Sequence, residues 1–145
     1  MREITAVYPS EYQVLIEVWE RSVRATHDFL TEDDIQFFKP LILNEYFQAV
    51  NLSCMKDKNG AILGFAGVAD NKLEMLFIDP AYRGEGVGKA LLAFVISQQG
   101  VTLVDVNEQN EQAVGFYLHN GFKVLSRSEV DGMGKPFPLL MMGLV

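Results

Sequence analysis

The chain has 145 residues, of which 49% are hydrophobic and 21% charged, and its formal net charge is −7 at pH 7. A hydrophobic fraction this high excludes a disordered chain, and the acidic balance argues against a general nucleic-acid surface, which needs clustered positive charge. The length predicts a single domain, residues 1–145, with one proper hydrophobic core.

No apolar run approaches the roughly 18 residues that a membrane-spanning helix needs. The N-terminal residues lack the apolar stretch and cleavage site of a signal peptide. The lone cysteine, Cys54, cannot form an internal disulfide. We therefore expect a cytoplasmic protein without nucleic-acid or membrane partners. We also expect no metal site, since the two histidines and one cysteine show no ligand spacing.

The N-terminal third predicts one strand followed by two helical regions. Residues 1–9 have the pattern of a strand that ends at Pro9. Apolar residues then recur at helical spacing, with Ser10 as the expected N-cap. A second helical region covers 31–50 and begins with the capping sequence TEDD. Pro40 is expected to break this second region into two pieces.

The rest of the chain predicts six further strands and two further helices. The strands are 51–57, 61–69, 71–80, 101–107, 122–130 and, partnering the last, 136–145; the helices are 87–98 and 110–120. DKNG is a hairpin turn signal, and Gly121 is suited to end the second of these helices. Three strands joined by hairpins, followed by alternating helices and strands, predict an α/β fold whose mixed sheet has helices on both faces.

The segment RGEGVG, residues 83–88, places three glycines directly before a helix. A helix N-terminus offers unpaired amides and partial positive charge, and glycine lets an anion approach the backbone. Arg83 and Lys89 add two cations. The spacing excludes a nucleotide P-loop, because Arg83 and Ala90 stand where its first Gly and its Ser or Thr belong. Lys89 likewise occupies the third glycine of a dinucleotide fingerprint. The loop is predicted to bind another phosphate ligand, unless it only begins a helix.

Two motifs together resemble the signatures of a known family. The loop fits the pattern Arg/Gln-x-x-Gly-x-Gly/Ala between a strand and an apolar helix. Residues 106–122, VNEQNEQAVGFYLHNGF, fit a second pattern of Asn, Asn-x-x-Ala, Tyr and Gly-Phe. Both resemble the GCN5-related N-acetyltransferases (GNAT), in the expected order and spacing. Within that family, RSVRATHDFL, LFIDP, DVNEQNEQAVGFY and GKPFPLL resemble the bacterial YjaB-type acetyltransferases.

The resemblance implies an acetyl-CoA-dependent N-acetyltransferase with a mixed, mostly antiparallel sheet of about six or seven strands. In that family a strand splays from its neighbour and its backbone pairs with the pantetheine arm of the cofactor. An asparagine at the start of the later helix, here 110–120, contacts the same arm while capping that helix. The implied cofactor-binding residues are Leu76, Phe77, Ile78, Arg83, Gly84, Glu85, Gly86, Val87, Gly88, Lys89, Asn110 and Tyr117.

The resemblance also implies that Tyr117 is the general acid that protonates the leaving CoA thiolate. Tyr117 lies seven residues after Asn110, about two helical turns along the same face. Its alternative role is that of a half-buried aromatic with a structural hydroxyl. The base stays open between Glu74, His27 and water. Alternation along the strand predicts that Glu74 lies on the same face as Leu76. The alternative for Glu74 is a solvent-exposed glutamate with no role in catalysis. The alternative for His27 is a residue that only caps the end of its helix.

The amine acceptor, a small molecule or a protein lysine, is expected beside the first two helices and the last hairpin. The candidates there are Trp19, Ser22, His27, Phe29 and the turn DGMGKPFP, residues 131–138. A non-catalytic acyl-CoA sensor on the same fold is the alternative function. The sequence is compatible with a monomer or a homodimer.

Overall fold

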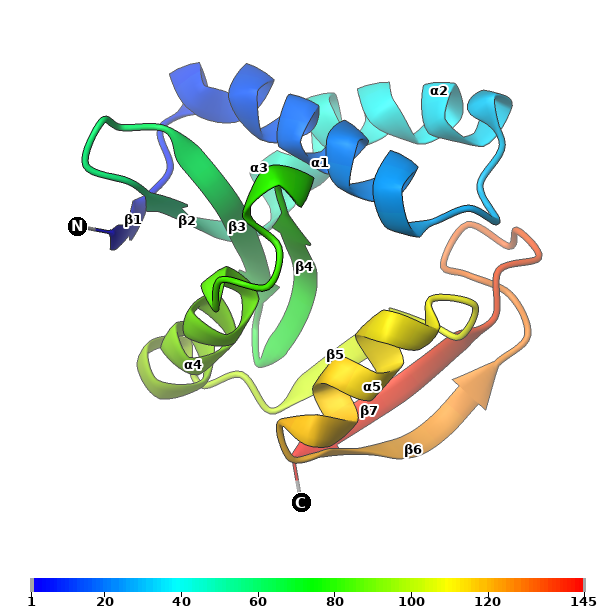
Figure 1. Cartoon of the computed structure of the whole chain (residues 1–145). Coiled ribbons are helices and arrows are strands. Elements are labelled where there is room, and N and C mark those ends of the chain that lie inside the picture. Colours follow the sequence, from blue (N-terminus) through cyan, green and yellow to red (C-terminus); the bar gives the residue numbers. More distant parts are fainter. Residues whose placement is uncertain (1, 145) are drawn as a thin grey trace.

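The computed structural model describes residues 2–144, which form one seven-stranded sheet between two layers of helices (Figure 1). The strands are β1 (Glu3–Ala6), β2 (Asn51–Lys56), β3 (Ile62–Ala69), β4 (Lys72–Ile78), β5 (Leu103–Asn107), β6 (Phe122–Ser128) and β7 (Leu139–Leu144). Their order in the sheet is β1-β2-β3-β4-β5-β7-β6. Every neighbouring pair is antiparallel except β4 and β5. The predicted mixed, mostly antiparallel sheet is confirmed.

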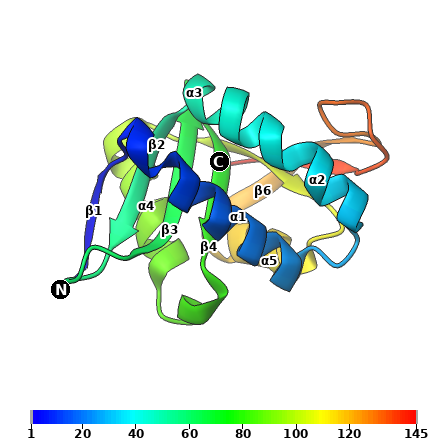
Figure 2. The same cartoon turned by 90° about the horizontal axis from the view of Figure 1, so that it is seen from above.

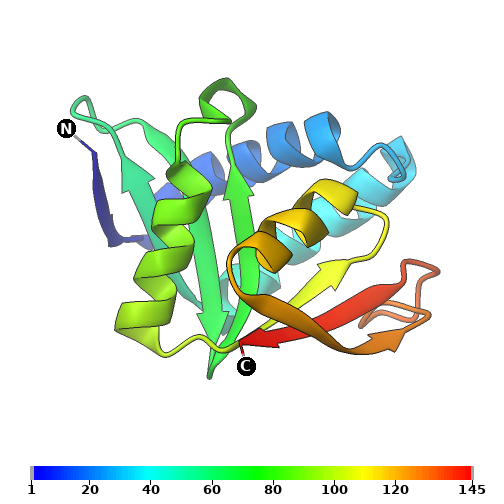
Figure 3. The same ribbon diagram turned by 60° about the horizontal axis from the view of Figure 1, so that its bottom comes forward.

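The helices divide between the two faces of this sheet (Figure 2). One face is covered by α1 (Tyr12–Thr26) and by the run of α2 (Glu32–Leu41), η2 (Ile42–Tyr46) and α3 (Phe47–Ala49). The other face is covered by α4 (Val87–Gln99) and α5 (Glu111–His119), which stand in front of the sheet in Figure 3. Each layer has its own buried apolar cluster. No helix within residues 2–144 is long and apolar enough to cross a membrane.

Two local predictions in the N-terminal third are wrong. Ser10 does not cap α1, because it lies inside a short 3-10 turn, η1 (Pro9–Glu11), that precedes the helix. The turn is closed instead by Glu11, whose Oε1 accepts a hydrogen bond from the Tyr8 amide at 2.9 Å. Pro40 does not break the second helical region, since it lies inside α2 and the chain continues helically through η2.

The segment η2 shows how the helix accommodates proline. Its residues form a π-helical turn that begins directly after α2. Proline has no amide hydrogen and crowds the preceding turn, and wider π-type pairing lets the helix continue past such a defect. The predicted start of this region is confirmed, because Thr31 Oγ1 accepts a hydrogen bond from the Asp34 amide at 3.1 Å.

The sheet opens between β4 and β5. These two strands pair only at their beginnings, where Lys72 lies opposite Leu103 and Leu73 opposite Val104. Further along, β4 pairs with β3 alone, while β5 continues against β7. The strand before the glycine loop therefore separates from its neighbour, as the family resemblance implies.

Among residues 2–144, the edge of β4 that faces the opening carries backbone groups with no hydrogen-bond partner. The Asp79 amide donates to the Leu63 carbonyl at 2.9 Å, so this residue faces β3. Backbone direction alternates along an antiparallel strand. Leu76 and Ile78 therefore turn their amides and carbonyls toward the opening, next to the loop that begins α4.

Candidate active site

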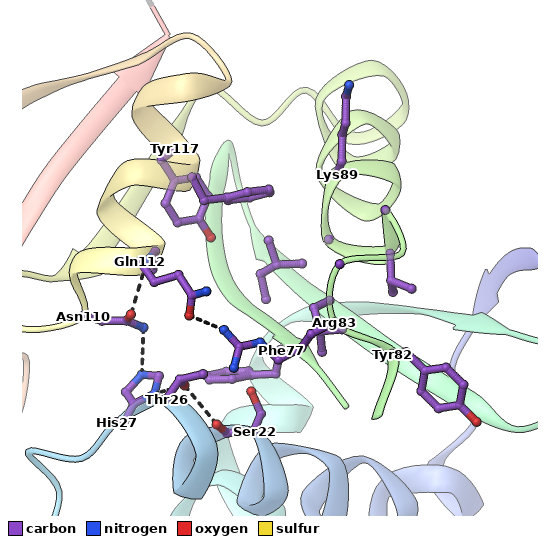
Figure 4. Close-up of a pocket in the computed structure, with 18 residues that line it drawn as sticks. Ser22, Thr26, His27, Phe77, Tyr82, Arg83, Lys89, Asn110, Gln112 and Tyr117 are labelled. Atoms are coloured by element: carbon purple, nitrogen blue, oxygen red, sulfur yellow. Dashed lines mark hydrogen bonds between the residues drawn. The ribbon is translucent and has the colours of Figure 1, made fainter. Parts of the chain in front are cut away.

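A cavity of about 330 Å³ lies at the opening between β4 and β5, and is called here the glycine-loop cavity (Figure 4). It is lined by Ser22, Thr26, His27, Leu76, Phe77, Ile78, Tyr82, Arg83, Gly84, Gly86, Val87, Gly88, Lys89, Asn110, Gln112, Ala113, Phe116 and Tyr117. Every cofactor-binding residue predicted above is in this set except Glu85. The structure thus brings the two sequence motifs together around one space.

The glycine loop presents open backbone to this cavity. Gly84 and Gly86 have φ values of +78° and +83°, a conformation that favours glycine. A Cβ at either position would meet no protein atom within 4 Å. Gly86 is the N-cap of α4 and has no side chain to cap it, so the first amides of the helix are free to bind an anion. The loop therefore fits the phosphate ligand that the sequence predicts there.

An ion pair anchors the entrance to the loop against α1. Asp79 is buried, and its Oδ1 accepts a hydrogen bond from the Ala81 amide at 3.1 Å. Its Oδ2 accepts from Arg21 Nη2 at 2.8 Å. Neither partner of this pair is predicted from the sequence. They are 58 residues apart, and no local pattern connects them.

The charged residues of the loop point in different directions. Arg83 reaches across the opening and donates a hydrogen bond to Gln112 at the start of α5 (Figure 4). Lys89 lines the cavity, but its ammonium points along α4 away from the glycines (Figure 4). Glu85 lies outside the cavity lining, and its carboxylate pairs with Arg2. Arg83 is thus the loop cation that faces the cavity, and Gln112 is a lining residue for which the sequence has no signal.

Tyr117 projects its hydroxyl into the cavity from α5 (Figure 4). The residue is only 6% exposed, and its ring packs edge-on against Phe116 and Phe122. Within residues 2–144 the hydroxyl makes no hydrogen bond to the protein. Burial raises the pKa of Tyr117 above its usual value, so the phenol stays protonated at neutral pH. The hydroxyl is thus a proton donor aimed at the opening.

His27 and Asn110 meet across the opening from opposite helices. Asn110 caps α5, because its Oδ1 accepts a hydrogen bond from the Ala113 amide at 3.2 Å. Its Nδ2 lies 3.4 Å from Nε2 of His27, which ends α1. Burial lowers the pKa of His27 to about 4, while the nearby Asp28 acts in the opposite direction. The imidazole is therefore neutral at physiological pH.

Glu74 lies elsewhere than predicted. It is the extra residue of a β-bulge, because the β3–β4 register shifts between Gly67 and Val68. The bulge breaks the two-residue alternation, so that Leu73 and Leu76 both pack against the cluster under α4 and α5. The prediction that Glu74 shares the face of Leu76 is therefore wrong.

A second cavity of about 420 Å³, called here the Glu74 cavity, lies on the face covered by α1. It is lined by Trp19, Ile42, Tyr46, Ala49, Val50, Ala69, Glu74, Met75 and Phe77. Glu74 is the one charged residue in this lining. Partial burial raises the pKa of Glu74, although Lys72 partly offsets the shift. Phe77 lines both cavities, so the two adjoin at this side chain.

The first two helices and the last hairpin do meet, as predicted for the acceptor side. Phe137 packs between Phe29 and Phe38, with ring centroids 6.0 and 6.5 Å away. The ammonium of Lys135 lies 4.3 Å from the centre of the Phe37 ring. The predicted acceptor residues nevertheless separate, because Trp19 lines the Glu74 cavity whereas Ser22 and His27 line the glycine-loop cavity.

Comparisons with known proteins give a consistent result. Residues 51–124 match the model of the acetyltransferase (GNAT) domain. The peptidyl-lysine N-acetyltransferase YjaB of Escherichia coli (strain K12) is 42% identical over 135 residues, 93% of this chain and 91% of that protein. The solution structure of apo-form YjaB from Escherichia coli covers 100% of this chain and 98% of its own, with a TM-score of 0.90 at 40% identity. The PaiA N-acetyltransferase of Thermoplasma acidophilum, solved in complex with coenzyme A, shares the fold, with a TM-score of 0.76 at 22% identity over 100% of this chain and 99% of its own.

Proposed function

Since the chain belongs to the acetyltransferase (GNAT) family and is an acetyl-CoA-dependent N-acetyltransferase, we propose that it acetylates the side-chain amine of protein lysines. The family, the enzyme class and the acetyl donor predicted from the sequence are confirmed. The lysine acceptor is supported by the relative YjaB, a peptidyl-lysine N-acetyltransferase that is 42% identical over most of the chain. It is further supported by the Glu74 cavity, whose apolar walls suit an alkyl stem and whose carboxylate suits an ammonium.

The open edge of β4 that leads to the glycine loop is the main structural support for the proposed acetyl-CoA binding. The backbone groups of Leu76 and Ile78 face the opening and would pair with the pantetheine arm as an added strand does. The free amides after Gly84 and at the start of α4 would bind the diphosphate, with Arg83 as the neighbouring cation. The thioester would then lie between the two cavities, near Phe77.

Tyr117 and Glu74 would divide the proton transfers. The lysine amine must lose protons to attack the thioester carbonyl, and Glu74, with its raised pKa, would accept one directly or through water. As the new C–N bond forms and the C–S bond breaks, the Tyr117 hydroxyl would supply a proton to the departing sulfur. The second amine proton would pass to solvent, from which the Tyr117 phenolate would be reprotonated. The transfer is direct, from donor to acceptor bound together, and it needs no covalent intermediate on the enzyme.

An acetylation assay with matched variants tests this function. A lysine-containing peptide and a set of small primary amines are each incubated with acetyl-CoA, and both CoA release and the acetylated product are measured. We expect transfer to the peptide lysine. Glu74→Gln should lower kcat by roughly 100-fold without weakening acetyl-CoA binding, because a positioned base contributes about that much. Glu45→Gln, on the exposed surface of η2 and outside both cavities, is the control.

Two outcomes would contradict the proposal. Transfer to small amines alone would exclude the lysine acceptor and leave the rest of the mechanism standing. Calorimetric binding of acetyl-CoA without transfer to any amine would instead favour the acyl-CoA sensor that the sequence left as the alternative.

A further inference from the structure

A chain of hydrogen bonds runs from the end of α1 to the start of α5, across the opening between β4 and β5 (Figure 4). Thr26 Oγ1 donates to the Ser22 carbonyl at 2.9 Å and lies 2.7 Å from Nδ1 of His27. Nε2 of His27 lies 3.4 Å from Nδ2 of Asn110. Oδ1 of Asn110 accepts from the Ala113 amide at 3.2 Å. Of these four contacts, the one between His27 and Asn110 joins the two helices across the cavity, and the other three hold its partners in place.

The two ends of this chain determine where every proton lies. The Ala113 amide can only donate, so Asn110 accepts through its oxygen and turns its NH2 group, a donor, toward His27. The Ser22 carbonyl can only accept, so it takes the single hydroxyl proton of Thr26. The Thr26 oxygen is then left to accept from Nδ1 of His27. His27 therefore carries its proton on Nδ1 and offers the lone pair of Nε2 to Asn110.

This arrangement leaves His27 no free nitrogen. Nδ1 is used by Thr26 and Nε2 by Asn110. The ring lies among aromatic side chains, with centroids 5.2 Å from Phe29 and 6.4 Å from Phe77. A general base needs an accessible lone pair within hydrogen-bond reach of the substrate proton. The geometry therefore indicates that His27 is not the general base, the role for which it was one of three candidates from the sequence.

We propose that His27 is a positioning residue, whose neutral Nδ1–H imidazole orients the Asn110 carboxamide and links α1 to α5 across the glycine-loop cavity. The inference rests on the proposed placement of acetyl-CoA in that cavity. The pairing of β4 with β5 ends at Leu73, so other contacts must hold the two sides of the cavity together beyond that residue. In the described part of the chain, the other side-chain hydrogen bond that joins cavity-lining residues across the opening links Arg83 to Gln112.

Thr26 gives the sharpest test, because it touches the chain without being a candidate base. Thr26→Val has nearly the same shape and removes the oxygen that selects the Nδ1–H tautomer. We expect KM for acetyl-CoA to rise about three- to tenfold, the effect of one lost hydrogen bond, with kcat within about twofold. Thr26→Ser keeps the hydroxyl and should behave as the wild type.

His27→Gln separates positioning from proton transfer. The glutamine amide can accept from Asn110 but cannot act as a base at any accessible pH. We expect an unchanged pH–rate profile and a loss of kcat far smaller than the loss of a base would cause, whereas His27→Ala should raise KM as Thr26→Val does. A loss of kcat near 100-fold in His27→Gln, together with loss of one limb of the pH–rate profile, would overturn the inference and make His27 the base.

Nitrogen-15 NMR of the histidine rings reads the tautomer without any turnover. The wild type should show His27 as the Nδ1–H form, assigned by the loss of its signals in His27→Gln, and Thr26→Val should shift it toward the Nε2–H form. An Nε2–H tautomer in the wild type would overturn the inference. Because this measurement uses the protein without acetyl-CoA, its failure is distinguishable from failure of the proposed function, which the acetylation assay reports.

Discussion

Tyr117 shows how a single residue can be held ready for one chemical step. Its ring is buried, its hydroxyl faces the cavity, and burial keeps the phenol protonated. We predict that Tyr117→Phe lowers kcat by about 100-fold or more while KM for acetyl-CoA changes less than about threefold, because only the proton to the departing sulfur is lost. Steady-state kinetics of CoA release measures both constants.

The control for this substitution is Tyr12→Phe. Tyr12 packs its ring on Phe47 and lines neither cavity, so its hydroxyl should be dispensable for turnover. Unchanged kcat in Tyr117→Phe would remove Tyr117 from the acid role. A large rise in KM with unchanged kcat would instead point to a binding role alone.

At the scale of elements, the glycine loop and the first turn of α4 form the anion site as one unit. Gly86 combines a left-handed backbone with open space, so Gly86→Ala should cost about 1 kcal/mol in the free energy of unfolding. The added methyl group also projects where a phosphate would approach the amides. We predict that the Kd for acetyl-CoA, measured by calorimetry, rises by about tenfold or more.

Gly60 provides a matched control for that element. It has the same φ of +83° and equally open surroundings, but it lies in the turn between β2 and β3. Gly60→Ala should therefore lower stability by a similar amount and leave the Kd for acetyl-CoA unchanged. Equal affinity losses in the two variants would mean that backbone strain, not access of the ligand, weakens binding.

At the scale of the whole molecule, the free energy of unfolding should depend on the protonation of His27. In the unfolded chain this residue titrates near 6.5, whereas burial lowers its pKa to about 4 in the folded protein. The unfolded state therefore binds the proton first as the pH falls. We predict that the free energy of unfolding loses about 2 kcal/mol from this residue between pH 7 and pH 5.

His27→Gln isolates that contribution, because the carboxylates that also titrate are the same in both proteins. Chemical denaturation at several pH values should show the wild type losing about 2 kcal/mol more than the variant over that interval. The loss should level off below pH 4, where the folded protein also binds the proton. Parallel pH dependence in the two proteins would contradict a partly buried His27 that is neutral in the folded protein.

Several features of the site follow from short stretches of sequence. The glycine loop before α4 and the placement of Asn110 and Tyr117 two turns apart on α5 depend only on local geometry, and the structure has both. The Thr31 cap is local in the same sense. Local rules failed where a neighbouring turn replaced the expected cap at Ser10, and where a π turn let the helix continue past Pro40.

The sequence by itself determined the order of the elements, the anion loop and the residue types that face it, because helix periodicity and turn chemistry act within a few residues. Only the tertiary structure decided which face Glu74 occupies, since the bulge depends on its pairing with β3. It also decided the contact between His27 and Asn110, which lie 83 residues apart. Such contacts arise where strands separate and helices pack, and no local pattern specifies them.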